Sequence, residues 1–177
     1  MDWFSQRNDR EARPTRGNAR PHLSEITDHL LIGEYLRPGD IPWLATVHRV
    51  SAIHNLQDDE DLRINALDAT MLRDLAAQHR IHYVRTPIQD GSADDVAARL
   101  AVALTDLDTL IKGGYRVYLH CNAGLNRAPT LAIAWLRAYG GMSLNEALAH
   151  VKRRRACGPF MTVLEDHFGS RDHKPST

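Results

Sequence analysis

The feature that most constrains the fold of this chain is a buried strand joined to an apolar helix by only five residues. Residues 115–121, Tyr-Arg-Val-Tyr-Leu-His-Cys, have the short apolar pattern of a buried strand. Residues 127–141 have the composition of an apolar helix, and Pro129 suits its first turn. Residues 122–126 must therefore form a tight turn from strand to helix, as in α/β proteins.

The rest of the chain repeats this alternation. Further strands are predicted at residues 29–35, 49–56 and 81–88, and helices at residues 40–48, 68–80, 92–114 and 143–155, with residues 162–168 ending the ordered chain. Two helix starts carry N-cap signatures, Ser92 with Asp95 and Ser143 with Glu146. This order predicts an α/β fold, with helices on both faces of one sheet.

Length and composition predict a single domain. The 177 residues are 43% hydrophobic and 25% charged, which is usual for a chain with one buried core. We expect residues 1–21 to be a disordered, Arg-rich arm, residues 22–169 to be the folded domain, and residues 170–177 to be a flexible tail.

Charge and cysteine content exclude several classes of function. Lys plus Arg and Asp plus Glu number 22 each, so no net field favours nucleic acid or a membrane as partner. Cys121 and Cys157 are too few for a disulfide scaffold and favour a reducing compartment. The N-terminus lacks the pattern of a signal peptide, and no apolar run could span a membrane. We expect a cytoplasmic protein, with a monomer favoured.

The turn between the strand and the helix has the character of a phosphate-binding loop. It consists of Asn122, Ala123, Gly124, Leu125 and Asn126. Successive N–H groups of such a turn form an anion nest, and the following helix adds its positively polarised N-terminus. Arg127 can close this cradle with a bidentate grip on two phosphate oxygens.

Cys121 stands at the start of this loop, where its chemistry is altered. A free cysteine has a pKa of about 8.5, and a helix N-terminus with a nearby cation can lower it to roughly 3.5–7.5. Cys121 is then a thiolate nucleophile directed at phosphorus, with His120 in a supporting role. The predicted reaction is phosphomonoester hydrolysis through a phosphocysteine, without cofactor or metal. An inert packing cysteine is the alternative, and a metal site lacks further ligands at suitable spacing.

The leaving group of such a reaction needs a proton donor. Residues 90–95 contain three aspartates, of which Asp90 directly follows a predicted strand and can project at the edge of the sheet. Asp90 is therefore the candidate general acid, and then the base that activates water. Asp95 is better explained by capping, and Asp94 by solvation in the first turn of a helix. An ordinary turn aspartate is the alternative for Asp90.

Taken together, these residues resemble a known family. Residues 120–130, His-Cys-Asn-Ala-Gly-Leu-Asn-Arg-Ala-Pro-Thr, are similar to the signature of the cysteine-based protein tyrosine phosphatase superfamily, in its dual-specificity branch. The resemblance covers residues 26–168, and Asp90 stands at the spacing that this branch uses for its acid. It implies a mixed central sheet of about five strands flanked by helices, with residues 22–169 as the phosphatase catalytic domain.

Within this branch, residues 51–62, 124–129 and 153–159 resemble laforin and the plant starch phosphatases. Those glucan enzymes carry an aromatic after the acid, where this chain has Gly91, and aromatics in the segment corresponding to residues 58–68, which here has none. We therefore predict a dual-specificity protein phosphatase acting on phosphotyrosine, with phosphoserine and phosphothreonine as further substrates. A phosphoglucan phosphatase and a catalytically weak phosphate-binding module are the alternatives.

Three further positions bear on the mechanism. Ala128 stands where many family members have Ser or Thr to help the sulfur leave, so the second step is expected to be slow, and Thr130 lies two residues further on. The basic run of residues 152–155 is either a solvated helix end or a substrate-steering patch. Cys157 is expected to be a packing residue, with a reversible disulfide to Cys121 as the alternative.

Overall fold

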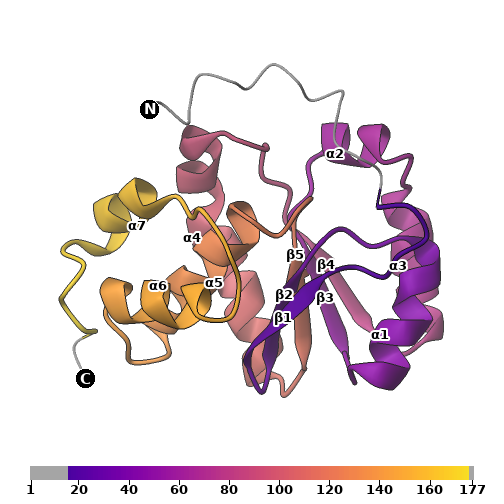
Figure 1. Cartoon of the computed structure of the whole chain (residues 1–177), viewed down its shortest axis with the longest axis horizontal. Helices are drawn as coiled ribbons and strands as arrows, with labels where there is room; N and C mark the ends of the chain where they lie inside the picture. Colours follow the sequence, from indigo (N-terminus) through magenta and orange to yellow (C-terminus); the bar gives the residue numbers. More distant parts are fainter. Residues whose placement is uncertain (1–15, 176–177) are drawn as a thin grey trace.

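The computed structural model describes residues 16–175, which form a five-stranded sheet between two groups of helices (Figure 1). The strands are β1 (Leu23–Thr27), β2 (Leu30–Gly33), β3 (Ala52–Asn55), β4 (His82–Arg85) and β5 (Val117–His120). The helices are α1 (Ile41–Val47), α2 (Asp59–Ile64), α3 (Ala69–Gln78), α4 (Ala93–Lys112), α5 (Arg127–Ala138), α6 (Leu144–Lys152) and α7 (Met161–Phe168). The predicted α/β fold with a mixed sheet of about five strands is confirmed.

The strand order places β5 at the centre of the sheet. The order is β1-β2-β5-β3-β4, with β1 antiparallel to β2 and all other neighbours parallel. His120 at the end of β5 lies opposite Gly33 of β2 and Asn55 of β3. Because parallel strands end at the same edge, the segments that follow β2, β3 and β5 converge there, which is where ligands bind in such sheets.

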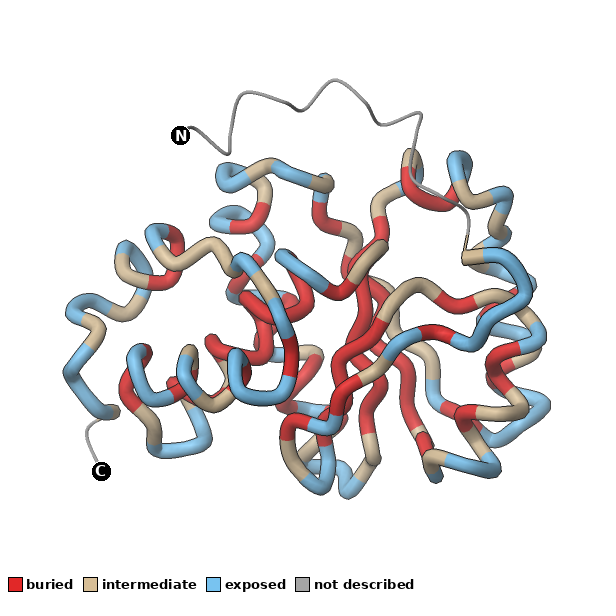
Figure 2. The backbone as a smooth tube through the Cα atoms, viewed as in Figure 1, coloured by how far each residue is buried: buried red, intermediate tan, exposed pale blue. Residues whose placement is uncertain are grey.

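Two apolar cores cover the two faces of the sheet. Side chains of α4, α5, α6 and α7 pack on one face, around Val117 and Leu119 of β5. Side chains of α1 and α3 pack on the other face, around Tyr118. Figure 2 shows the central strands buried along their length, while the outer faces of the helices are exposed. The continuous apolar run of residues 115–121 is therefore explained by burial on both sides.

Two elements were not predicted from the sequence. Strand β1 is short and carries Ser24 and Glu25, so it lacks a clear apolar alternation. Helix α2 has six residues, Asp-Glu-Asp-Leu-Arg-Ile, and begins with a capping box formed by Asp58 and Asp61. A helix this short owes its existence to its cap and its tertiary contacts rather than to propensity.

Both chain ends are ordered further than expected. Residues 1–15 and 176–177 lie outside the described residues. Within the expected arm, Arg16 forms an ion pair with Asp40 and donates to the carbonyl of Tyr35. In the expected flexible tail, the carbonyl of Arg171 accepts from the amide of Asn145 at 3.0 Å. These contacts place Arg16 and Arg171 against the folded part of the chain, and the boundaries at residues 21 and 170 stay predictions. No helix in the part of the chain that the structure describes is long and apolar enough to cross a membrane.

Candidate active site

Cys121 and the loop after it lie at the C-terminal edge of the sheet, at the top of β5 in Figure 1. Cys121 is buried, with 3% of its surface exposed. The loop is tied to its neighbours by main-chain hydrogen bonds: Tyr35 donates to the carbonyl of Asn122 at 2.9 Å, and Leu56 donates to the carbonyl of His120 at 2.8 Å. The strand ends thus fix the start of the loop.

A glycine is required at the middle of the loop. Gly124 has a φ of +65°, and a Cβ at this position would lie 2.6 Å from the carbonyl oxygen of Gly33 and 2.6 Å from Arg155 Nη2. Both the conformation and the close approach exclude larger residues. The predicted role of Gly124 in shaping the loop agrees with this geometry.

Arg155 donates hydrogen bonds to two main-chain carbonyls of the loop. Its Nε donates to the carbonyl of Gly124 at 2.6 Å, and its Nη2 donates to the carbonyl of Ala123 at 3.0 Å. In a trans peptide the N–H points opposite to the carbonyl, so the amides of Gly124 and Leu125 face the other side of the loop. No main-chain amide of residues 123–126 donates a hydrogen bond to another residue within the described range 16–175. Amides without a protein acceptor are what an anion nest requires, and the nest itself stays a prediction.

The role of Arg155 corrects the interpretation of residues 152–155. Neither a solvated helix end nor a substrate-steering patch describes Arg155, which is buried with 5% of its surface exposed. Lys152, Arg153 and Arg154 are exposed as expected. The sequence pattern missed Arg155 because its partners lie 31 and 32 residues away in the chain.

Arg127 is buried and is anchored through one of its nitrogens. Nη1 donates to Asp61 Oδ2 at 2.6 Å and to the carbonyl of Ile88 at 2.8 Å. Nη2 lies 3.1 Å from Asp90 Oδ1. Within residues 16–175, Nε and Nη2 have no hydrogen-bond partner. The guanidinium group is therefore held through Nη1, and its Nε–Nη2 edge has the fork geometry that suits two oxygens of an anion.

The charges around Arg127 keep it protonated. Burial alone would lower its pKa, but Cys121, Asp61 and Asp90 together raise the pKa of Arg127 above its ordinary value. Burial raises the pKa of Asp61, although Arg127 opposes this effect. Asp61 was not identified from the sequence, because it belongs to the short, charged segment of α2.

Of the three aspartates in residues 90–95, only Asp90 reaches Arg127. Its side chain is 17% exposed, and its carboxylate forms the ion pair with Nη2. Asp95 accepts from the amide of Gln89 at 2.6 Å, while its own amide donates to Ser92 Oγ at 3.1 Å. Asp94 is exposed. Asp95 caps and Asp94 is solvated as expected, whereas the general-acid role of Asp90 stays a prediction.

His120 supports the loop in a neutral form. Burial lowers its pKa to about 3, against the opposing hydrogen bond with the Cys121 carbonyl. Its Nδ1 lies 3.0 Å from that carbonyl oxygen. Because a carbonyl can only accept, Nδ1 carries the proton and Nε2 does not. His120 thus orients the peptide group at the nucleophile.

Two neighbouring side chains have partners away from the cysteine. The Thr130 hydroxyl donates to the carbonyl of Asn126 at 2.7 Å and accepts from the amide of Phe160 at 2.9 Å. It is therefore not placed to assist the sulfur. The side chain of Asn122 accepts from Asn65 Nδ2 at 2.7 Å and Gln57 Nε2 at 3.1 Å, so it contacts the residues on both sides of α2.

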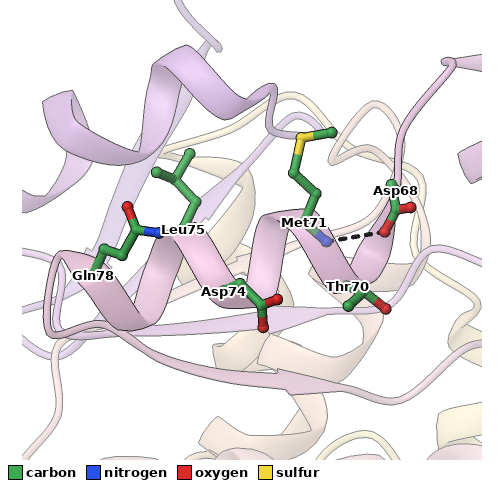
Figure 3. Close-up of a pocket in the computed structure, with 6 residues that line it drawn as sticks. All are labelled: Asp68, Thr70, Met71, Asp74, Leu75 and Gln78. Carbon is green, nitrogen blue, oxygen red and sulfur yellow. Dashed lines mark hydrogen bonds between the residues drawn. The ribbon is translucent and has the colours of Figure 1, made fainter.

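Cys157 and a surface hollow lie outside the reacting groups. Both cysteines are free, and burial raises the pKa of Cys157, which disfavours its thiolate. The hollow in Figure 3 lies along α3 and shares no residue with the loop. It is lined by Asp68, Thr70, Met71, Asp74, Leu75 and Gln78. Among residues 16–175, no cluster of three or more His, Cys, Asp or Glu side chains is arranged to hold a metal ion.

The chain is similar in sequence to known proteins. The family of the dual specificity phosphatase catalytic domain matches residues 43–164. The chain is 31% identical over 143 residues to the amyloplastic phosphoglucan phosphatase DSP4 of Castanea sativa, covering 79% of this chain and 38% of that protein. It is 29% identical over 128 residues to human dual specificity protein phosphatase 1, covering 69% of this chain and 34% of that protein. The chain therefore spans about a third of the length of these relatives.

Solved structures show the same fold. Tk-PTP in its active form has a TM-score of 0.69 and 24% identity, covering 81% of this chain and 94% of that one. A kinase associated phosphatase with its catalytic cysteine replaced by serine also has a TM-score of 0.69, with 19% identity and coverage of 85% and 94%. The chain belongs to the dual specificity phosphatase family.

Proposed function

We propose that this protein hydrolyses phosphomonoesters through a phosphocysteine on Cys121 and that its substrates are phosphoproteins, phosphotyrosine first. The observation that carries the proposal is the position of Asp90 beside the Nε–Nη2 edge of Arg127, with 3.1 Å between Asp90 Oδ1 and Nη2. Arg127 and the loop amides bind the phosphoryl oxygens, and Asp90 stands next to the bound group. The intact set of Cys121, Arg127 and Asp90 argues against a merely phosphate-binding module.

Two displacements at phosphorus make up the reaction. In the first, the Cys121 thiolate forms an S–P bond while the P–O bond to the leaving group breaks, and Asp90 gives its proton to the leaving oxygen. In the second, Asp90 takes a proton from water, the water oxygen bonds to phosphorus, and the S–P bond breaks. Inorganic phosphate and the thiolate are released. No step requires a metal, because Arg127 and the amides carry the charge of the transferring group.

A phosphoglucan is the second candidate substrate, because the Castanea sativa relative is named a phosphoglucan phosphatase. Against it, residues 58–68 contain no aromatic side chain, and Gly91 follows Asp90. Sugar rings stack on aromatic faces, so residues 58–68 and Gly91 are poorly suited to binding a glucan chain.

One panel tests the proposal. Phosphotyrosine, phosphoserine and phosphothreonine peptides, a phosphoinositide and solubilised phosphoglucan are compared at equal enzyme concentration. We expect the highest kcat/KM for the phosphotyrosine peptide, full activity in chelator, and no activity in Cys121→Ser. Cys157→Ser is the matched control and should retain activity. A preference for phosphoglucan would replace the substrate assignment, and activity in Cys121→Ser would overturn the mechanism.

A further inference from the structure

Asp58 has a second contact outside the helix that it caps. It is the N-cap of α2, and its Oδ1 accepts from the amide of Asp61 at 2.7 Å. Its Oδ2 accepts from the amide of Asp90 at 3.0 Å. One carboxylate therefore serves both the first turn of α2 and the main chain of the residue assigned as general acid.

The contacts of Asp58 belong to a closed network of interactions that also contains Arg127 and Asp90. The amide of Asp58 donates to Asp61 Oδ2 at 3.2 Å, and the same oxygen accepts from Arg127 Nη1. Arg127 Nη2 in turn lies 3.1 Å from Asp90 Oδ1. The phosphate-binding guanidinium and the acid are thus linked twice, once directly and once through the capping box of α2.

The segment that carries Asp90 is fixed at three successive amides. Ile88 donates to the carbonyl of Leu56 at 3.1 Å, and Gln89 donates to Asp95 Oδ2. The amide of Asp90 itself donates to Asp58, just before the chain turns through Gly91 at a φ of +72°. The first two bonds tie the segment to β3 and α4, whereas the third ties it to the helix that anchors Arg127.

We propose that Asp58 is a positioning residue for the proton transfer: its carboxylate holds the main chain of Asp90 and thereby places the acid over the phosphate that Arg127 binds. The inference rests on the proposed function, because it assumes that Asp90 is the acid. Position matters greatly here, since a misplacement of about 1 Å can reduce a rate by roughly 10²-fold.

An ordinary cap would not need a carboxylate at this position. Asn and Ser cap helices as well as Asp does, through a single oxygen that accepts from the first turn. Asp58 uses two oxygens for two different amides, which neither the amide nor the hydroxyl side chain offers. Asp58→Asn and Asp58→Ser therefore keep a capped α2 while removing the bond to Asp90.

The test is a series of aryl phosphates whose leaving phenols range from acidic to weakly acidic. Defects in proton donation are most severe for the poorest leaving group. We expect Asp58→Asn and Asp58→Ser to lose up to about 10²-fold in kcat/KM for phenyl phosphate and much less for p-nitrophenyl phosphate. KM for each substrate should change little. Asp68→Asn is the matched control, because Asp68 caps α3 in the same way, accepting from the amide of Met71 at 2.9 Å.

A double variant separates the possible failures. If Asp58 acts through Asp90, then Asp58→Asn combined with Asp90→Asn should lose no more activity than Asp90→Asn alone. Additive losses, or a loss in Asp58→Asn that is equal for every leaving group, would show that Asp58 does not act through Asp90 and would overturn the inference. If Asp90→Asn itself shows no dependence on the leaving group, the acid assignment has failed and the inference falls with it.

Discussion

Arg127 Nη1 lies 2.6 Å from Asp61 Oδ2, and the two side chains are 1% and 5% exposed, so Arg127 has a buried carboxylate as its fixed partner. This pairing decides which edge of the guanidinium is presented. With Nη1 directed to Asp61 and the Ile88 carbonyl, the Nε–Nη2 edge is the one left for an oxyanion. Orientation of the fork is therefore built into the fold.

Removal of Asp61 should damage both stability and phosphate binding. Asp61→Ala leaves the charge of Arg127 buried without its partner, so we expect the free energy of unfolding to fall by about 3–5 kcal/mol. Inhibition by inorganic phosphate should weaken, because the guanidinium is no longer oriented. Urea unfolding and the inhibition constant of phosphate measure the two effects. The control Asp59→Asn alters an ion pair with Arg85 in which Asp59 is 92% exposed, and should change stability by about 1 kcal/mol or less.

The contrast between Cys121 and Asp61 shows what could be predicted from the sequence. Cys121, Gly124 and Arg127 lie within seven consecutive residues between a strand and a helix, so local spacing alone identified the cradle. Asp61 and Arg155 act on the same cradle from 66 and 31 residues away. Such partners leave no local pattern, and a six-residue helix has too few turns to show apolar periodicity.

Arg155 should be needed for the shape of the loop. In Arg155→Met the carbonyls of Ala123 and Gly124 lose their donors, and each buried unsatisfied group costs about 1–3 kcal/mol. We expect a lower melting temperature, a higher KM and a lower kcat for an aryl phosphate. Arg154→Met, at the exposed neighbouring position, should leave all three close to those of the unchanged protein. Equal effects of the two substitutions would mean that net charge, not the contact with the loop, matters.

Replacement of Asp90 should remove the proton donor. Asp90→Asn is expected to lower kcat by roughly 10²–10⁴, and the limb of the pH–rate profile on which the acid loses its proton should disappear. Asp94→Asn should change neither kcat nor the pH–rate profile, since Asp94 is exposed. Asp95→Ala should lower stability by about 1 kcal/mol through the lost bond to Gln89 and leave the profile unchanged. A lost limb in Asp95→Ala with a normal Asp90→Asn would reverse the assignment.

Two buried histidines should make the fold sensitive to mild acid. Burial lowers the pKa of His54 and of His120 to about 3, against about 6.5 in an unfolded chain. The unfolded chain therefore binds the protons first, and their contribution to stability is complete above about pH 6.5 and is lost as the pH falls toward 3. Each histidine contributes a slope of up to about 1.4 kcal/mol per pH unit. Urea unfolding between about pH 7 and pH 5 measures the slope, which His54→Gln should roughly halve. No change in the slope would show that His54 is not the titrating group.

Ala128 leaves the sulfur without a nearby hydroxyl for the second step. Thr130, the nearest hydroxyl in the helix, is held by the Asn126 carbonyl and the Phe160 amide. The departing thiolate therefore lacks a charge-assisted hydrogen bond that is worth roughly 1.5–3 kcal/mol. Breakdown of the phosphocysteine should then limit the rate, and stopped-flow with an aryl phosphate should show a burst of phenol near one equivalent per active site.

Ala128→Ser should restore this donor and speed the steady state by up to about tenfold, since 1.4 kcal/mol corresponds to a factor of ten. Ala132→Ser is the matched control, because Ala132 lies one turn further along α5 and both alanines are fully buried. It carries the same penalty for a buried hydroxyl without placing that hydroxyl at the sulfur. The expected result is a shrinking burst and a faster steady state in Ala128→Ser only. A linear time course in the unchanged protein, with no gain in Ala128→Ser, would show that a loop amide or water already stabilises the departing thiolate.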